Sequence, residues 1–252
     1  MIGRGGTSVF VYIRIREWMP LAAATALIML CFLLPRGGSD DALPAAGLSD
    51  TARPTLVIDA GHGGEDGGAS TAGGTLESEI NLAVAQKLDA LARLFGVDTV
   101  MTRTSEAIDY PPEAETTAAR KRADQSARLR LINTTPGAVL VSIHQNFYPD
   151  PRPSGPQVFY ADTPGSRELA ETAHSYLVSA LAPDSRRVAA PASEDIYLMR
   201  EADCTAILAE CGFLSNPQEA AALETEDHRT AIAAALLAAF LEYCSMEDVT
   251  VT

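Results

Sequence analysis

Residues 55–64 carry the sequence TLVIDAGHGG. The first five form a short, uninterrupted run of mainly aliphatic and β-branched residues, which favours a strand covered on both faces. The glycines that follow predict a sharp turn, and His62 lies within it. Strands of this type are typical of a parallel sheet flanked by helices, so this stretch predicts an α/β fold.

The rest of the chain alternates in the same way between short β-rich runs and segments with helical periodicity. The other predicted strands are Val97–Thr102, Ala138–Ile143, Gln157–Tyr160 and Thr205–Ala209. The predicted helices are Glu77–Phe95, Arg120–Asn133, Arg167–Leu181 and His228–Cys244. This alternation predicts a single α/β domain over residues 54–246, with a mostly parallel central sheet flanked by helices and a tail at 247–252.

The N-terminal segment has the charge pattern of an export signal. Three arginines and one acid precede Trp18–Leu34, a run of 17 uncharged and mostly apolar residues. The basic residues orient the N-terminus inward, so everything downstream is expected to be exported. Residues 1–35 are therefore predicted to be a signal peptide or membrane anchor, followed by a linker at 36–53. The pattern leaves cleavage open, so the protein is expected to be either membrane-anchored or secreted.

The composition excludes some functions. The 252 residues include 19 basic and 33 acidic side chains, which gives a net charge of −14. Such a chain repels nucleic-acid phosphates, so nucleic acid is excluded as a partner. The four cysteines, Cys31, Cys204, Cys211 and Cys244, form no C-x-x-C pair. A structural zinc knuckle is therefore not expected, and the cysteines are predicted to be buried thiols or residues without a functional role.

Three candidate functional residues follow predicted strands. In open parallel sheets, ligand sites gather just beyond the carboxyl ends of the strands. His62 closely follows the first predicted strand, and His144 and Glu210 directly follow the third and the fifth. The chain has only four histidines, and the other two, His174 and His228, are expected to be surface or capping residues.

A fourth candidate lies on the helix Glu77–Phe95. The apolar stripe of this helix has helical spacing and comprises Ile80, Val84, Leu88, Leu91 and Phe95. At about 100° per residue, Glu77 projects into the middle of this stripe, whereas Glu79 points to the opposite side. An unpaired buried carboxylate is costly, and a metal ion bound to Glu77 would offset that cost.

Two histidines and a carboxylate form a known catalytic zinc ligand set, which leaves a fourth position open for water. A second carboxylate beside that water would serve as general base and later as general acid. Glu77 and Glu210 can fill these two roles, and their spacing alone leaves open which residue fills which.

Five separated segments, in order, resemble the zinc-dependent N-acetylmuramoyl-L-alanine amidases of the amidase_3 type. They are VIDAGHGGEDGGA (57–69), ESEINLAVAQKL (77–88), VMTR (100–103), LVSIHQN (140–146) and ILAECGFLSNPQEA (207–220). The resemblance implies that His62, Glu77 and His144 bind one Zn²⁺ per chain and that Glu210 activates the attacking water. It also implies a substrate, the peptidoglycan amide between the lactyl group of N-acetylmuramic acid and L-alanine of the stem peptide.

Within that family, the chain most resembles the amidases of sporulation and germination. The segments that carry this likeness are RKRADQSARLRLIN (120–133), SGPQVFY (154–160) and IYLMREADCTAILAECGFLSNP (196–217). The resemblance implies removal of stem peptides as the first step towards muramic-δ-lactam in the spore cortex. Two alternatives stay open: a zinc peptidase that cuts within the stem peptide, and a non-catalytic module that binds the wall. The need for a protein activator is also open.

Three positions depart from the usual pattern of the family. Lysine is common where Ser78 stands, alanine where Phe147 stands, and a small aliphatic residue where Cys211 stands. These departures remove no expected ligand, but they leave substrate preference open and make Cys211 a candidate for sensitivity to oxidation. The basic run Arg120–Arg130 either contacts an anionic glycan or, as is more common, forms a solvated helix face.

Overall fold

The computed structural model describes residues 53–250, with side chains described as far as Met246. The predicted signal or anchor helix at 1–35 lies outside the described residues, as does the linker up to residue 52. The described residues form a single α/β domain, which confirms the predicted fold class for this part of the chain.

Six strands form one sheet in the order β2-β1-β3-β6-β4-β5. Their bounds are β1 (Thr55–Ala60), β2 (Thr99–Met101), β3 (Ala138–Asn146), β4 (Gln157–Tyr160), β5 (Ala190–Pro191) and β6 (Thr205–Phe213). β2, β1, β3 and β6 are mutually parallel, whereas β4 runs antiparallel to β6 and pairs in parallel with β5. The prediction of a mostly parallel sheet is therefore confirmed. β5 was not predicted, because two residues show no periodicity.

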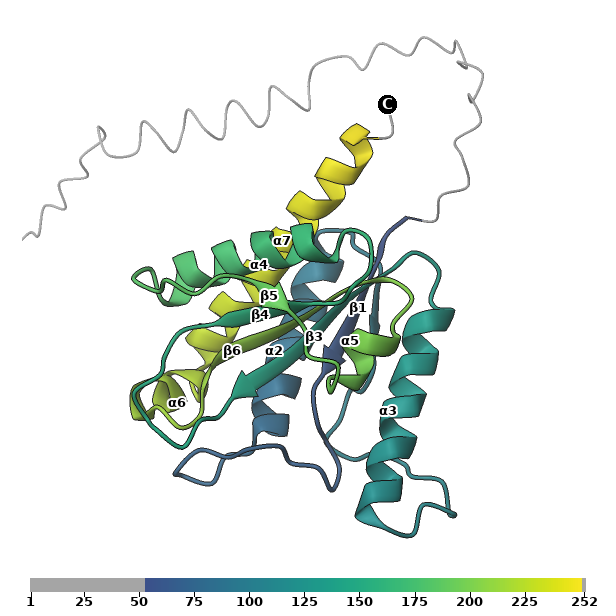
Figure 1. Cartoon of the computed structure of the whole chain (residues 1–252), viewed down its shortest axis with the longest axis vertical. Coiled ribbons are helices and arrows are strands. Elements are labelled where there is room, and N and C mark those ends of the chain that lie inside the picture. The colour runs from purple at the N-terminus through teal and green to yellow at the C-terminus, as the bar shows by residue number, and fades with distance from the viewer. Residues whose placement is uncertain (1–52, 251–252) are drawn as a thin grey trace, which may run out of the picture. The chain divides into compact units, whose positions relative to one another are not determined.

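Helices cover both faces of the sheet (Figure 1). Their bounds are α2 (Glu77–Leu94), α3 (Thr117–Thr134), α4 (Ser166–Leu181), α5 (Tyr197–Glu201), α6 (Pro217–Leu223) and α7 (Glu226–Thr250). α2, α4 and α7 pack on one face, and α3 and α5 pack on the other. The short helices α5 and α6 were not predicted, and α7 continues to Thr250, into the segment predicted as a tail.

The alternation of side chains along the strands builds the two halves of the core. In β1, Leu56 and Ile58 pack with α2 and α7, whereas Val57 packs with Ile132 of α3 and Leu198 of α5. Successive side chains of a strand point to opposite faces, so a strand covered on both sides needs apolar residues at every position. This is the physical reason for the uninterrupted run that begins at Thr55.

Helix α2 follows its predicted apolar stripe except at the end. Ile80, Val84 and Leu88 are fully buried, but Phe95 is 64% exposed. The prediction for Phe95 was wrong because the helix ends at Leu94 and Gly96, at φ +75°, turns the chain away.

The C-terminal helix α7 is, among the described helices, the one long and apolar enough to cross a membrane. Its apolar residues Ile232, Leu236 and Phe240 are buried in the core with α2 and α4. This burial is that of a core helix in a folded domain.

Candidate metal centre

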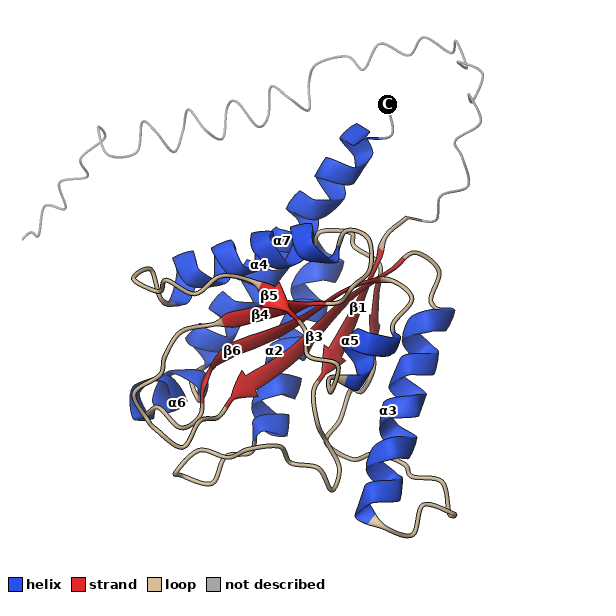
Figure 2. Ribbon diagram, in the orientation of Figure 1, coloured by secondary structure: helices blue, strands red, loops and turns tan. Residues whose placement is uncertain are grey.

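The carboxyl ends of β1 and β3 point to the same edge of the sheet (Figure 2), and β6 runs parallel to β3. His144 lies within β3 and Glu210 within β6, where the two are register partners and project from the same face. Both strands are longer than predicted, so these residues lie inside the strands rather than after them. A bulge between His144 and Asn146 then interrupts the ladder, as is common beside functional sites.

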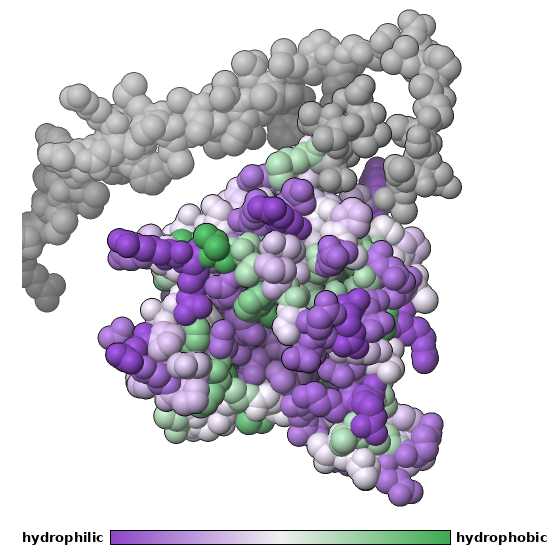
Figure 3. Space-filling model, in the orientation of Figure 1, coloured by the Kyte–Doolittle hydropathy of each residue, from purple (hydrophilic) through white to green (hydrophobic). Residues whose placement is uncertain are grey.

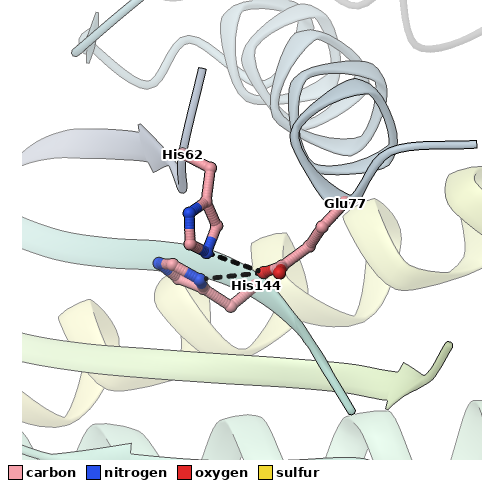
Figure 4. Close-up of side chains that lie close together, drawn as sticks. All are labelled: His62, Glu77 and His144. Carbon is pink, nitrogen blue, oxygen red and sulfur yellow. Dashed lines mark hydrogen bonds and ion pairs between the residues drawn. The ribbon is translucent and has the colours of Figure 1, made fainter. Parts of the chain in front are cut away.

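Three of the four sequence-predicted residues converge at this edge (Figure 4). Oε1 of Glu77 lies 3.3 Å from Nε2 of His62 and 3.1 Å from Nδ1 of His144. His62 comes from the loop after β1, Glu77 from the first residue of α2, and His144 from β3. One nitrogen of each ring therefore faces the same carboxylate oxygen.

Glu77 is buried, as its helical position predicts, and Glu79 is exposed. The Glu77 carboxylate accepts hydrogen bonds from the backbone N–H of Gln145 at 3.1 Å and of Ala69 at 3.0 Å. Asn81, one helical turn later, donates its side-chain amide to the same carboxylate at 3.3 Å. Burial would raise the pKa of Glu77, but its contacts with His144 and His62 outweigh burial and hold the pKa well below its usual range.

The geometry of these three residues fits a divalent metal ion. Their ligand atoms all lie within 4.8 Å of one another. Two ligands of one tetrahedral zinc ion are about 3.3–3.6 Å apart, given zinc–nitrogen and zinc–oxygen bonds of about 2.0–2.2 Å. The separation of 3.3 Å lies at the lower end of this range, and the separation of 3.1 Å is slightly shorter. The residues could therefore hold a metal ion with small adjustments of their side chains.

The loop before α2 adopts an unusual backbone conformation to bring His62 to the site. Among the described residues, His62 is the one non-glycine residue with a positive φ, at 60°. A Cβ on Gly61 would lie 2.3 Å from the His144 ring, and a Cβ on Gly68 would lie 2.4 Å from Oε2 of Glu77. Glycine is thus required at these two positions because the backbone passes directly against the site.

Two buried arginines hold the backbone of this loop. Arg128 donates to the carbonyls of Ala60 and His62, both at 2.6 Å, and pairs with the buried carboxylate of Asp59 at 2.8 Å. Arg103 donates to the carbonyl of Ala60 at 2.9 Å and to other carbonyls nearby. The interpretation of Arg120–Arg130 as a solvated face is therefore wrong for Arg128, which is 5% exposed.

The other end of α3 also contacts the loop. Arg120 pairs with Glu65, and Lys121 pairs with Asp66 at 2.8 Å. Three basic side chains of α3, those of Arg120, Lys121 and Arg128, therefore pair with acids of this chain. The front of the molecule over α3 is largely hydrophilic (Figure 3).

Glu210 differs from Glu77 in that one of its carboxylate oxygens has no hydrogen-bond partner among the described residues. Its Oε2 is buried and accepts no hydrogen bond from the described residues. Burial raises the pKa of Glu210 to about 7, with His144 and His62 opposing the shift and Glu77 adding to it. A carboxyl group with a pKa near neutrality is suited to both accepting and returning a proton.

A small hollow of about 80 Å³ opens beside the site, lined by His62, His144, Lys121, Gln125 and Leu198 among others. A larger hollow of about 450 Å³ lies at the ends of β4 and β5. Because β4 runs antiparallel to β6, this larger hollow is at the other edge of the sheet, away from the candidate metal centre.

The structure also shows the surroundings of the three residues that depart from the family pattern and of His174. Ser78 donates its hydroxyl to Glu106 at 2.9 Å, and Phe147 is half-exposed at the end of β3. Cys211 is buried and forms no disulfide with the other described cysteines, Cys204 and Cys244. Burial strongly raises the pKa of its thiol, which argues against oxidation sensitivity. The expectation of a surface or capping role was wrong for His174, which is 6% exposed within α4.

The sequence interpretation missed the residues that support the ligand candidates. Asn81 could have been found, because a residue four positions after Glu77 lies on the same helix face. Arg103 and Arg128 could not, because a charged side chain is expected at the surface unless its buried partner is known.

A model of the N-acetylmuramoyl-L-alanine amidase family matches residues 56–242. The germination-specific N-acetylmuramoyl-L-alanine amidase of Bacillus subtilis is 30% identical over 233 residues, which cover 90% of this chain and 94% of the relative.

Two solved structures are also similar. The CwlD amidase from Clostridioides difficile, in complex with the GerS lipoprotein, has a TM-score of 0.73 at 32% identity and covers 77% of this chain and 99% of its own. The catalytic domain of CwlV, from Bacillus (Paenibacillus) polymyxa var. colistinus, has a TM-score of 0.65 at 26% identity, with 76% and 98% covered.

Proposed function

This chain belongs to the N-acetylmuramoyl-L-alanine amidase family, and we propose that it uses zinc to hydrolyse the amide between N-acetylmuramic acid and L-alanine of peptidoglycan. The observation that carries the proposal is the convergence of two imidazole nitrogens on one oxygen of Glu77. The buried, unpartnered oxygen of Glu210 on the neighbouring strand adds the second carboxylate that the reaction needs.

In this proposal Nε2 of His62, Nδ1 of His144 and the Glu77 carboxylate hold Zn²⁺. When bound, Zn²⁺ supplies Lewis acidity to the scissile carbonyl and makes water a nucleophile at neutral pH. Gln145, Ala69 and Asn81 keep the Glu77 carboxylate in place through three hydrogen bonds. These hydrogen bonds limit the rotation of the carboxylate, which reduces the entropy cost of binding a metal ion.

Glu210 is the proposed general base and acid. It takes a proton from the attacking water and returns it to the L-alanine nitrogen as the amide bond breaks, so the products are a free lactyl carboxylate and a free amino terminus. Burial and the raised pKa of Glu210 support this role, because the carboxyl group can exchange a proton near neutral pH. Loss of such a group typically lowers the rate about 10²–10⁴-fold.

We infer the biological setting from the relatives and from the N-terminal charge pattern. The germination-specific relative supports a role in the spore cortex, where removal of stem peptides would precede formation of muramic-δ-lactam. The CwlD amidase was solved with a lipoprotein, which supports a protein partner for this chain as well. Residues 1–35 would direct the protein to the outer side of a membrane, as an anchor or as a cleaved signal.

Digestion of purified peptidoglycan by the full-length protein tests the proposal. We expect new amino termini on L-alanine, loss of activity with a chelator, and recovery on addition of Zn²⁺. Mass spectrometry of the products separates the alternatives, because a peptidase would leave the muramic acid–L-alanine bond intact. Intact stem peptides on muramic acid after digestion by zinc-loaded protein would contradict the proposal.

Two variants test the assigned roles. Glu210→Gln is expected to retain fold and zinc but to lose activity about 10²–10⁴-fold. Glu77→Gln is expected to lose zinc. Glu79 is exposed and lies two residues further along the same helix, so the control variant Glu79→Gln should keep both zinc and activity. Zinc stoichiometry by elemental analysis and circular dichroism accompany each assay. A fully active Glu210→Gln enzyme would remove Glu210 from the mechanism.

A further inference from the structure

The two ring nitrogens of His62 face different carboxylates. Nε2 lies 3.3 Å from Glu77, whereas Nδ1 lies 3.1 Å from Oδ1 of Asp66. The other oxygen of Asp66, Oδ2, accepts from the Lys121 ammonium at 2.8 Å. A continuous polar chain therefore runs from the candidate metal centre through the loop to α3.

His144 has no corresponding partner. Its Nδ1 faces Glu77, and no described side chain, from residue 53 to Met246, makes a hydrogen bond or ion pair with its other nitrogen. The His144 ring is held instead by its place in β3 and by close packing against Gly61. His62, on a loop at positive φ, lacks a strand to define its position and depends on side chains for its orientation.

We propose that Asp66, held in turn by Lys121, is a positioning residue that fixes the tautomer and ring plane of His62. This inference rests on the proposed metal site. A carboxylate at Nδ1 keeps the proton on that nitrogen, so the lone pair of Nε2 is directed at the side where Glu77 lies. Lys121 limits the rotation of the Asp66 carboxylate, because each carboxylate oxygen then has its own partner.

Asp66 also accepts from the backbone N–H of Gly68 at 3.3 Å, so a purely structural role in the loop is the alternative. The two roles separate on substitution by asparagine. Asp66→Asn keeps an oxygen that can accept from Gly68 and from the His62 ring, but it loses the charge and the attraction to Lys121. Asp66→Ala loses all three contacts.

The neighbouring residue offers a matched control. Glu65 lies on the same loop and pairs with Arg120 of the same helix, but it contacts no ligand candidate. Glu65→Ala therefore removes an ion pair between the loop and α3 without touching His62. Lys121→Met tests the outer part of the chain at a half-exposed position where a change in fold is not expected.

The experiment measures the zinc affinity of the full-length protein by competition with a chelator. Asp66→Ala is expected to weaken zinc binding about 10–100-fold, as loss of a carboxylate partner of a metal-bound histidine typically does. Asp66→Asn should restore part of that loss, and Lys121→Met should weaken binding only a few-fold by the same principle. Glu65→Ala should leave the affinity within about two-fold, since it removes no partner of a ligand.

Nitrogen NMR of the zinc-loaded wild type and of Lys121→Met adds a readout that a structural role would not move. We expect a protonated Nδ1 on His62 in the wild type and a shifted Nδ1 resonance in the variant. Wild-type zinc affinity in Asp66→Ala, or equal losses in Asp66→Ala and Glu65→Ala, would overturn the inference and leave the proposed amidase intact. Failure of the wild type to bind zinc would overturn the proposed function itself.

Discussion

The two histidines of the candidate metal centre are held in place by different means. His144 lies inside β3, where Glu210 of β6 is its register partner and the ladder with β1 extends to the preceding residue, Ile143. His62 lies in the loop after β1, at a positive φ, and the support for its backbone comes from Arg128 and for its ring from Asp66. One residue is thus placed by a repeated backbone pattern and the other by a few particular side chains.

This difference predicts how the two parts of the site respond to mutation: the loop that carries His62, and the strand half, which is β3 and β6 with His144 and Glu210. A strand keeps its register when one side chain changes, because many backbone hydrogen bonds hold it. A loop held by a few buried charged groups lacks these backbone hydrogen bonds. Removal of one charged partner leaves the other buried and unpaired. Substitutions of the buried residues that support the loop are therefore expected to lower the free energy of unfolding more than comparable substitutions within the strands.

The largest effect is expected from Arg128→Met. This change leaves the Asp59 carboxylate buried without its guanidinium and removes the donor to the His62 carbonyl. We expect a loss of about 3–5 kcal/mol in the free energy of unfolding, measured by urea denaturation at neutral pH. Arg130→Met, exposed on the same helix, is the control and should change stability by less than about 0.5 kcal/mol. Equal stabilities of the two variants would show that the loop does not depend on Arg128.

The second prediction compares two glycines of the same loop. Gly68 and Gly74 both have a positive φ, so alanine at either position costs about 1–2 kcal/mol of backbone strain. Only at Gly68 would the new Cβ also meet Glu77 and His62, because the space beside Gly74 is open. Gly68→Ala should therefore cost about 1–3 kcal/mol more than Gly74→Ala.

Zinc affinity separates these glycine variants further. Gly68→Ala should weaken zinc binding, because the clash displaces two ligand candidates, whereas Gly74→Ala should leave it unchanged. Chelator competition on the folded proteins measures this difference. Similar affinities for the two variants would mean that the loop moves aside without disturbing His62.

The comparison also explains what could be predicted from the sequence. The parallel sheet could be predicted because strands covered on both faces are apolar throughout. The burial of Glu77 could be predicted because successive residues of a helix are rotated by about 100°, which places Glu77 on the same side as the apolar stripe. The ends of β3 and β6 were placed too early, because the polar residues His144 and Glu210 end the apolar runs while pairing with each other continues the ladder.

The supports of His62 were beyond the reach of local patterns. Arg128 is 69 residues from Asp59, and nothing in the helix around it distinguishes a buried arginine from its exposed neighbours. Its partner becomes known only when α3 is placed against the end of β1. The roles of the four candidate residues in catalysis stay predictions, whereas their placement at one edge of the sheet is a property of the fold.

The third prediction uses pH to test the ion pair behind the loop. Burial would raise the pKa of Asp59, but Arg128, Ser142 and Thr102 outweigh it and lower the pKa to about 2, from an ordinary 3.8. A carboxyl group with a lowered pKa stabilises the fold above its unfolded pKa, and this contribution is lost as the pH falls towards the folded pKa. The contribution corresponds to about 2 kcal/mol.

The stability of the wild type relative to Asp59→Asn should therefore be constant above about pH 5 and shrink by about 2 kcal/mol between pH 4 and pH 2. Urea denaturation of both proteins across this range measures the difference. Asn cannot titrate, so any residual pH dependence common to both proteins belongs to other groups and cancels. A gap that is independent of pH would show that Asp59 is not held as a carboxylate by Arg128.

The smallest effect is expected within the strand half. Cys211 is buried in β6 and follows Glu210, which pairs with both β3 and β4, so Cys211→Ala removes one sulfur atom beside a residue that two strands hold. We expect a loss of about 1 kcal/mol in stability, with zinc affinity unchanged. In the wild type, a thiol reagent should label Cys211 only after unfolding, as judged by mass spectrometry. If Cys211→Ala instead weakened zinc binding as much as Gly68→Ala does, the strand half would be no more tolerant than the loop, and the distinction between the two histidines would not hold.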